Sequence, residues 1–322
     1  MSGQDGVTQD GITRRRFGRA LAGAALLPLS AAGVAPLVSS PAAAFQSTRI
    51  GAADVLVISD GHLQLPVRFA FPDVAEIELA AALGEGPLDG VVLRPDCNVT
   101  LARVGSRTIL FDVGAGSNFM PTAGELGRNL EAAGVDPKEV TDVLFTHAHP
   151  DHLWGLLDDF DEVVFENASY RINALEWDYW RASDTLAKTP DDRKMMVVGA
   201  QSRLEVLADR IEFFAYGEEV VPGVEAVDTS GHTPGHASFI LHSEGDSVMI
   251  VGDALTNVAI SFGHPDWPSG ADQDSAKGIA TRQKLLDRLA TDALRMVGFH
   301  MPHPGLGAVE RAGSGYRFVA TA

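Results

Sequence analysis

The sequence predicts an α/β fold in which two mixed β-sheets pack together and helices cover their outer faces. Short apolar strands and helical segments alternate irregularly along the chain. Many of the strands are separated by only a few turn-forming residues, which is typical of hairpins. A purely parallel, doubly wound sheet would instead show a regular alternation of strand and helix, so a mixed arrangement is favoured.

The composition indicates a globular protein with an acidic surface. Of the 322 residues, 45% are hydrophobic and 21% are charged, which is enough apolar material for a sizeable core. The formal net charge of -18 argues against a nucleic-acid partner, because phosphate binding needs a basic surface. The single cysteine, Cys97, excludes an intramolecular disulfide and a cysteine-rich zinc site, and we interpret it as a small buried hydrophobe.

The N-terminal residues 1–44 have the pattern of a secretory signal. Three arginines precede Phe17, an uncharged apolar run extends from Ala20 to Ala44, and small residues stand at the end of this run. The paired arginines resemble the twin-arginine type of signal. A membrane anchor is the alternative, but three prolines and many small residues make the run a poor spanning helix. We therefore expect a cleaved signal, a periplasmic or secreted protein without a stable membrane anchor, and one folded domain over residues 45–322.

Two hairpins and a helix are expected in the first part of this domain. Asp54–Ser59 reads as a strand, Asp60-Gly61 as a turn, and Leu63–Val67 as the partner strand. Asn98–Val104 and Thr108–Val113 form a second pair. A helix is expected at residues 124–133, since Gly134 is a suitable residue to end it.

The rest of the chain alternates between short strands and helices. Residues 174–209 are rich in helix formers, and a second helix is expected over Ser275–Ala290. The expected strands share a short, apolar, β-branched character. They are Val140–Phe145, Val163–Phe165, Ser169–Ile172, Ile211–Ala215, Val224–Asp228, Ser238–His242 and Val248–Val251.

The strongest chemical signal follows the strand at residues 140–145. His147, His149, Asp151 and His152 lie within six residues, although the whole chain has only 10 histidines. Imidazole and carboxylate groups suit zinc, iron, manganese and cobalt. A loop at the carboxyl end of a strand is also the usual place for an α/β active site. The pattern predicts a metal site here.

The chain here resembles the metallo-β-lactamase superfamily, whose signature is His-x-His-x-Asp-His. Further matches follow in the order that the family has. They are Thr229-Ser230-Gly231-His232-Thr233-Pro234-Gly235-His236, then Val251-Gly252-Asp253, then Gly298-Phe299-His300. The resemblance covers roughly residues 50–320 and implies the family's αβ/βα sandwich, which agrees with the two mixed sheets expected above.

The resemblance also implies two divalent metal ions, with zinc favoured over iron, manganese or cobalt. It assigns His147, His149 and His232 to the first ion. It assigns Asp151, His152 and His300 to the second, with Asp253 bridging the two. Because a metal lowers the pKa of a bound water towards about 7, a hydroxide shared by the ions would be the nucleophile. Asp151 and Asp253 are the expected catalytic carboxylates, since they can accept a proton.

Other polar residues are expected to support this centre. Asp112, which follows the apolar residues Thr108–Phe111, and His236 are candidates for orienting the ligands. His303 is an alternative to His300, but His300 has the spacing that the family shows. The remaining histidines, His62, His242 and His264, lie outside any motif.

Local matches favour one branch of the superfamily. Ser59-Asp60-Gly61, Pro190-Asp191-Asp192 and the segment at residues 315–319 look like the methyl parathion hydrolase branch. That branch hydrolyses organophosphate triesters, and its relatives include lactonases and aryl esterases. We expect a dinuclear hydrolase of small neutral esters of one of these three kinds. Its apolar pocket would be lined by aromatic residues. The candidates are Phe119, Trp177, Trp180, Phe262 and Trp267.

Two other functions stay open at this point. A periplasmic metal-binding module without catalysis would use the same fold, although all seven ligands are present. A β-lactam hydrolase would suit the compartment, but such enzymes typically lack the bridging aspartate. A small-molecule substrate is the expected partner in the main hypothesis, and a homodimer is left open.

Overall fold

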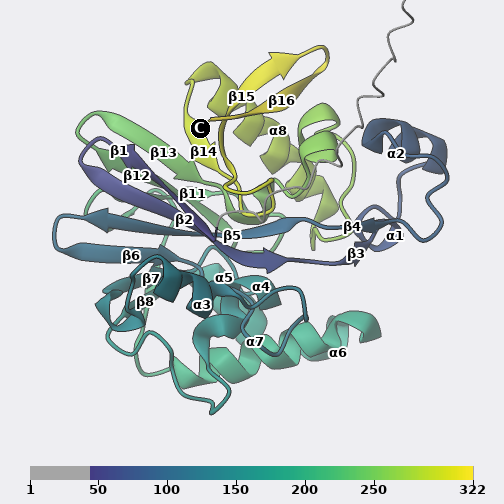
Figure 1. The fold of residues 1–322 in the computed structure, drawn as a ribbon. Coiled ribbons are helices and arrows are strands. Elements are labelled where there is room, and N and C mark those ends of the chain that lie inside the picture. The colour runs from purple at the N-terminus through teal and green to yellow at the C-terminus, as the bar shows by residue number, and fades with distance from the viewer. Residues whose placement is uncertain (1–43, 322) are drawn as a thin grey trace, which may run out of the picture. The chain divides into compact units, whose positions relative to one another are not determined.

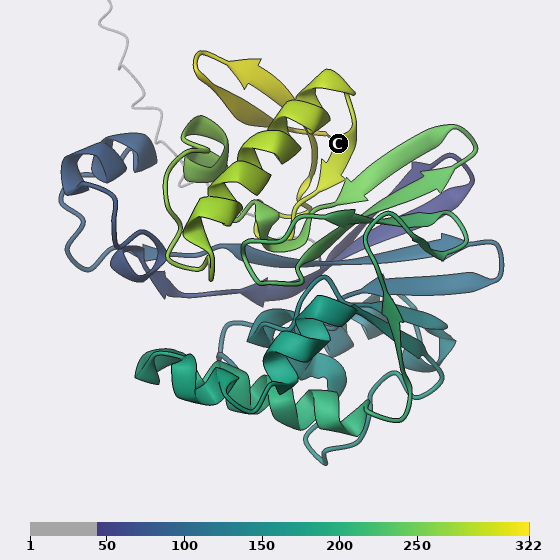
Figure 2. The same ribbon diagram turned by 180° about the vertical axis from the view of Figure 1, so that it is seen from behind.

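The structure is a computed structural model that describes residues 44–321 (Figures 1 and 2). The predicted signal, up to residue 43, lies outside the described residues. Within residues 44–321, no helix combines the length and hydropathy that crossing a membrane would require.

The first sheet has seven strands in the order β1-β2-β5-β6-β7-β8-β9. Their bounds are β1 (Phe45–Ile50), β2 (Ala53–His62), β5 (Asp96–Val104), β6 (Arg107–Phe111), β7 (Asp142–Leu144), β8 (Ser169–Asn173) and β9 (Ile211–Phe214). The strands from β1 to β6 pair antiparallel, and those from β6 to β9 pair parallel. The first sheet is therefore mixed. The loop after β7 leaves the edge at which the parallel strands have their carboxyl ends.

The second sheet also has seven strands, in the order β10-β11-β12-β13-β14-β15-β16. Their bounds are β10 (Glu219–Val221), β11 (Val224–Asp228), β12 (Ala237–Ser243), β13 (Asp246–Ile250), β14 (Arg295–Val297), β15 (Leu306–Ala312) and β16 (Gly315–Ala320). Only β13 and β14 pair in parallel. The two sheets share a buried apolar core in which Phe111 of β6 meets Phe239 of β12, with ring centroids 5.5 Å apart.

Helices cover the outer faces, as Figure 1 shows. The first sheet carries α3 (Leu126–Ala132), α4 (Pro150–Leu153), α5 (Ala174–Arg181), α6 (Thr185–Lys188) and α7 (Lys194–Val206) over a second apolar core. The second sheet carries α8 (Ser275–Thr291), whose Leu285, Leu286 and Leu289 are buried. Asp274 starts α8 by accepting a hydrogen bond from the backbone N–H of Lys277. The prediction of two mixed sheets with helices outside is confirmed.

Short 3-10 helices and one π-helix lie in the connections between the described elements. They are η1 (Pro137–Glu139), η2 (Trp154–Leu156), η3 (Asp191–Arg193), η4 (Gly252–Ala254) and the π-helix η5 (Val258–Phe262).

The segment between β2 and β5 differs from the prediction. Asp60 is not a hairpin turn residue, because β2 runs on to His62 and pairs with β1 and β5. The buried carboxylate of Asp60 accepts backbone hydrogen bonds from Ala115 and Leu126, which ties β2 to the loops beside it. The expected pairing of β2 with the strand at residues 63–67 is therefore wrong.

That segment instead forms a small unit of its own. It contains the short strands β3 (Leu65–Pro66) and β4 (Val92–Leu93), which pair with each other, and the helices α1 (Val67–Ala70) and α2 (Glu76–Leu83). Its apolar residues pack around Leu79 and against Ile260 of η5. The strand expected at residues 163–165 is also wrong, because only an isolated bridge joins Val163 to Leu157.

Candidate metal centre

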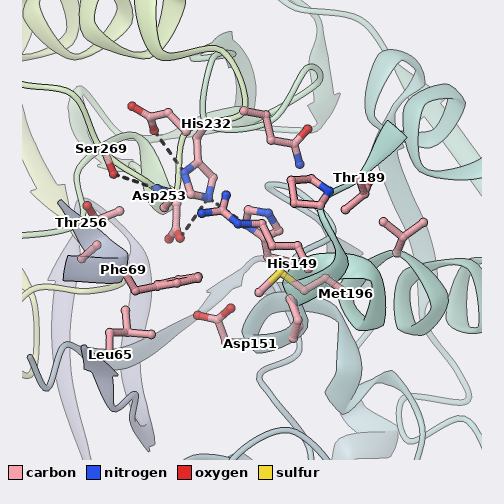
Figure 3. A pocket seen from close by; sticks show the side chains of 18 of the residues that line it. Leu65, Phe69, His149, Asp151, Thr189, Met196, His232, Asp253, Thr256 and Ser269 are labelled. Atoms are coloured by element: carbon pink, nitrogen blue, oxygen red, sulfur yellow. Dashed lines mark hydrogen bonds and ion pairs between the residues drawn. The ribbon is translucent and has the colours of Figure 1, made fainter. Parts of the chain in front are cut away.

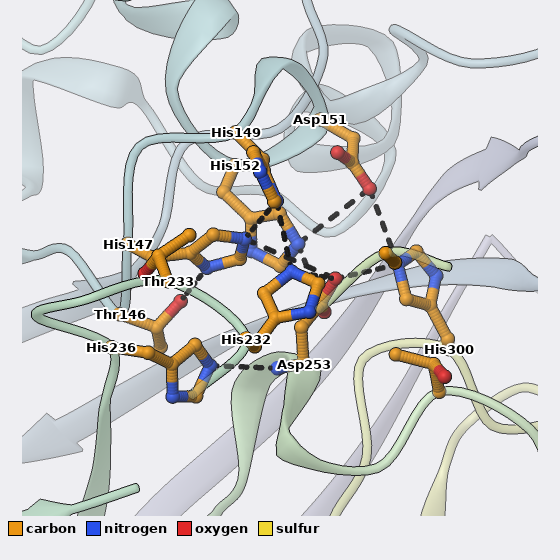
Figure 4. A network of polar contacts seen from close by, with 12 residues as sticks. Thr146, His147, His149, Asp151, His152, His232, Thr233, His236, Asp253 and His300 are labelled. Atoms are coloured by element: carbon orange, nitrogen blue, oxygen red, sulfur yellow. Dashed lines mark hydrogen bonds and ion pairs between the residues drawn. The ribbon is translucent and has the colours of Figure 1, made fainter. Parts of the chain in front are cut away.

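The loop after β7 brings four of the predicted ligands to one place. β7 is a buried strand in the parallel part of the first sheet, and the loop leaves its carboxyl end. Pro150 then occupies the first turn of α4, where its fixed φ favours a helix start. This short helix carries Asp151 and His152, and Oδ2 of Asp151 lies 3.5 Å from Nε2 of His152 (Figure 4).

The other three ligands come from the second sheet. His232 lies in the loop between β11 and β12, Asp253 lies in η4 directly after β13, and His300 follows β14. Since β13 and β14 are parallel neighbours, their carboxyl ends place Asp253 and His300 side by side. Their side chains approach within 3.2 Å, measured from Oδ2 of Asp253 to Nε2 of His300.

The seven side chains form two groups that share one carboxylate. The first group is His147, His149, His232 and Asp253, and the second is Asp151, His152, Asp253 and His300. Within each group the candidate ligand atoms all lie within 4.8 Å of one another. The shared residue, Asp253, lies 3.1 Å from Nε2 of His152 and 3.3 Å from Nε2 of His232. Two cations held side by side would thus both reach Asp253.

The chemistry of these groups fits cations. Buried polar atoms are normally hydrogen bonded, but Oδ2 of Asp151, Nε2 of His152 and Oδ1 of Asp253 have no such partner among the described residues. Nδ1 of His149 also faces Nε2 of His232 at only 2.8 Å. Two divalent ions would give these converging atoms a shared partner.

The pKa shifts agree with this interpretation. Burial, together with the neighbouring His232, lowers the pKa of His149 to about 3, so its imidazole is neutral and able to bind a metal. Burial also lowers the pKa of His152, but Asp253 and Asp151 outweigh it and raise the pKa to about 10. The carboxylates therefore attract positive charge strongly, and bound cations would supply it.

Buried polar groups orient several of these side chains. Asp112 accepts a hydrogen bond from Nδ1 of His152, at 2.8 Å. His236, which was expected to support the centre, lies with Nε2 2.9 Å from the backbone N–H of Asp253 and accepts its hydrogen bond. His300 places Nδ1 2.9 Å from the backbone carbonyl of Asp96. His303 contacts the side chain of Asn98 instead and belongs to neither group.

Two buried acids beside the centre were not found from the sequence. Asp272 lies 3.4 Å from Nδ1 of His232 and is itself paired with Arg282 of α8. Glu176 of α5 accepts hydrogen bonds from both histidine loops. Neither residue lies in a recognisable sequence motif. Each comes from a segment far along the chain from the histidine motifs, and the packing of a helix brings it to the centre.

A cavity of about 480 Å³ opens onto the two groups. Figure 3 shows Leu65 and Phe69 on one side of it and Met196 and Thr189 on the other. Its floor includes one residue from each histidine loop, His149 and His232, together with both candidate catalytic carboxylates, Asp151 and Asp253. The walls are largely hydrocarbon and aromatic.

The five expected pocket residues divide into two sets. Phe119 and Trp180 line this cavity. Trp177 packs against Phe213, with ring centroids 5.4 Å apart, and Trp267 stacks on the ring of His264 at 3.9 Å; neither lines it.

Phe262 is fully buried in the core beneath α8 and also lies away from the cavity. The unit between β2 and β5 forms one wall of the cavity, and the sequence did not predict this. It contributes Leu63, Leu65, Phe69, Phe71 and Leu93. Its short elements have no strong periodic pattern.

A family model for the metallo-beta-lactamase superfamily matches residues 92–300, more than half of the chain. The chain belongs to this superfamily. The resemblance seen in the sequence is thereby confirmed at the level of the superfamily.

Two solved structures resemble the protein over most of its length. One is AidC, a dizinc quorum-quenching lactonase in complex with a product, with a TM-score of 0.80, 26% identity, and coverage of 86% of this chain and 97% of that one. The other is the hydrolase AbOPH of the beta lactamase superfamily, with a TM-score of 0.80, 26% identity, and coverage of 88% and 99%.

One curated relative shares only part of its length with this chain. Ribonuclease TTHA0252 of Thermus thermophilus is 30% identical over 180 residues, which are 55% of this chain and 39% of the ribonuclease. The chain thus spans well under half of that enzyme. The superfamily consists of metal-dependent hydrolases, and the two groups of His and Asp side chains are where this member could hold its ions.

Proposed function

We propose that this metallo-beta-lactamase superfamily member is a dinuclear metal-dependent hydrolase of small neutral esters, with lactones as the first class to test. The observation that carries the proposal is the pair of ligand groups sharing Asp253 at the floor of a largely apolar cavity. The apolar walls suit a neutral substrate with a hydrocarbon portion, because desolvating a charged one there would be costly.

The residues have distinct roles in this proposal. His147, His149, Asp151, His152, His232, Asp253 and His300 hold two divalent ions, with zinc proposed for both. When bound, such ions supply a hydroxide nucleophile at neutral pH and stabilise the oxyanion that forms on attack. Asp151 and Asp253 line the cavity, and in this proposal either carboxylate would accept a proton and pass it to the leaving oxygen.

Lactones come first because of the structural relatives. AidC is a dizinc lactonase, and it matches this chain at 26% identity over nearly its full length. Aryl esters and phosphotriesters need the same nucleophile and oxyanion stabilisation, so they belong to the same panel of substrates. The local matches to the methyl parathion hydrolase branch are the reason to include phosphotriesters.

The test is a kinetic panel on purified protein that has been depleted of metal and then reconstituted with zinc. The panel contains an N-acyl homoserine lactone, an aryl ester, a phosphotriester and a β-lactam. We expect turnover of the lactone that a chelator abolishes and zinc restores. Protein that holds two ions per chain but is inert towards the whole panel would point to a binding module, and turnover of the β-lactam alone would point to a β-lactam hydrolase.

We also propose export through a twin-arginine-type signal that is cleaved after Ala44. In support, the first strand of the fold, β1, begins at Phe45, so cleavage there would keep every described strand and helix. N-terminal sequencing of the protein from the periplasm of producing cells tests this proposal. A cytoplasmic protein with an intact N-terminus would contradict it.

A further inference from the structure

A buried carboxylate outside both ligand groups joins the two loops that carry the histidines of the first group. Glu176 lies in the first turn of α5, and its side chain is fully buried. Its Oε1 accepts a hydrogen bond from the backbone N–H of Ala148, the residue between His147 and His149, at 3.0 Å. Its Oε2 accepts hydrogen bonds from the other loop.

The contacts of Oε2 lie directly beside His232. The hydroxyl of Thr233 donates to Oε2 at 2.7 Å, and the backbone N–H of Gly235 donates at 2.9 Å. Gly235 is needed for this approach, because a Cβ there would lie 2.1 Å from the backbone nitrogen of Glu176. The loop of His232 and the first turn of α5 are therefore in close backbone contact.

A fourth donor connects Glu176 to a ligand ring. The indole N–H of Trp180, one helical turn further along α5, donates to Oε1 at 2.6 Å. The ring of Trp180 packs edge-on against that of His149, with centroids 5.6 Å apart. One oxygen of Glu176 thus accepts a hydrogen bond from the loop of His147 and His149, and the other accepts hydrogen bonds from the loop of His232.

Three of the four partners, the N–H groups of Ala148, Gly235 and Trp180, can only donate, and a carboxyl group accepts from all three. A carboxamide of the same size would turn its NH₂ group towards one of the two loops and leave a buried N–H without an acceptor. Glutamine at this position would therefore loosen one loop relative to the other.

We propose that Glu176 is the positioning residue that sets the spacing of the first ligand group, by clamping the loop of His147 and His149 against the loop of His232. The inference rests on the proposed metal centre but not on the identity of the substrate. Among the described residues, the second group is held by other contacts, since Asp112 orients His152 and the carbonyl of Asp96 orients His300. Loss of the clamp should therefore affect one ion more than the other.

The test counts and locates metal in Glu176→Gln. After reconstitution with zinc, we expect two ions per chain in the wild type. In the variant, we expect one ion to be held as before and the other to bind about 10- to 100-fold more weakly in competition with a chromogenic chelator. Anomalous scattering from crystals of the variant should find the retained ion at the second group.

The matched control is Asp178→Asn, which removes an exposed carboxylate two residues along the same helix. It should bind two ions with unchanged affinities. If Glu176→Gln fails to fold, Thr233→Val removes a single donor to Oε2 at nearly constant shape, and the same selective loss is expected to a smaller extent.

Three outcomes separate the possibilities. If both affinities in Glu176→Gln match the wild type, Glu176 does not position the ligands. If both fall equally while the melting temperature of the metal-free protein drops, the role of Glu176 is structural only, and the inference is overturned. If the wild type itself binds fewer than two ions, the proposed dinuclear centre fails, and the inference fails with it.

Discussion

Nδ1 of His152 lies 2.8 Å from the carboxylate of Asp112, a residue whose backbone φ is 63°. This left-handed conformation is uncommon outside glycine, although Asp and Asn tolerate it better than other residues. The same carboxylate accepts hydrogen bonds from the backbone N–H and the hydroxyl of Thr146, each at 2.7 Å. Asp112 therefore fixes both the start of the ligand loop and the orientation of one ligand ring.

Replacing Asp112 by Asn should weaken metal binding without unfolding the protein. Asn keeps the backbone conformation accessible but removes the negative charge that faces Nδ1 of His152. We expect metal affinity to fall about 10- to 100-fold, as for other residues that orient a ligand, measured by chelator competition. Asp161→Asn is the control, because Asp161 is exposed and has a similar φ of 60°. If metal affinity falls equally in both variants, the loss comes from the change of Asp to Asn at a positive φ and not from the missing charge beside His152.

Removing the shared carboxylate should disable the whole centre. Asp253 belongs to both ligand groups, so Asp253→Ala should lower kcat by several orders of magnitude and reduce the metal content of the purified protein. Elemental analysis and a lactone assay measure the two effects. His62→Ala is the comparison, since His62 belongs to neither group, and it should change activity little. The opposite pattern would place the active centre elsewhere.

Phe262 is a core residue, whereas Phe119 is a pocket residue, and the two should respond differently to replacement by alanine. Phe262 contacts Phe318 in the core under α8, with ring centroids 5.7 Å apart, whereas Phe119 lines the cavity. Phe262→Ala should lower the free energy of unfolding by about 3–5 kcal/mol and leave KM nearly unchanged. Phe119→Ala should mainly raise KM for substrates with a long hydrocarbon part. Urea denaturation and steady-state kinetics measure both quantities, and a large KM effect from Phe262→Ala at unchanged stability would contradict the assignment.

The stability of the first sheet should depend on pH through Asp142. The side chain of Asp142 is buried and accepts hydrogen bonds from Thr141, Arg107 and Arg171. Burial raises the pKa of Asp142, but these donors outweigh it and hold the pKa below its ordinary value of 3.8. Because the pKa is lower in the folded than in the unfolded state, the stabilisation is present above pH 3.8 and is lost as the pH falls through the folded value.

Asp142→Asn should therefore lower the free energy of unfolding by about 2 kcal/mol at neutral pH. Its difference from the wild type should shrink as the pH is lowered below about 4. Denaturation of both proteins at each pH measures this difference, and metal release at low pH affects both alike. Glu139→Gln breaks an exposed ion pair with Arg103 instead and should cost less than about 1 kcal/mol. A constant difference for Asp142→Asn across the pH range would exclude this linkage.

The sequence was most informative where chemistry is local. His147, His149, Asp151 and His152 fall within one short loop, so their residue types and spacing already indicate a metal site. His232, Asp253 and His300 could be added because each stands in its own short motif. The two mixed sheets could be expected for a similar reason, since strand and turn patterns depend on near neighbours along the chain.

The residues that only the tertiary structure could reveal act across long separations. Glu176 and Asp272 carry no motif, and each reaches the centre because a helix packs beside a loop from another part of the chain. Trp177 and Trp180 lie three residues apart, yet only Trp180 lines the cavity, because the direction of each ring depends on what the helix packs against. Local sequence determined which side chains could bind metal and which segments become strands. The packing of distant elements decided which side chains orient the ligands and which form the cavity wall, because such contacts join residues whose spacing along the chain has no fixed period.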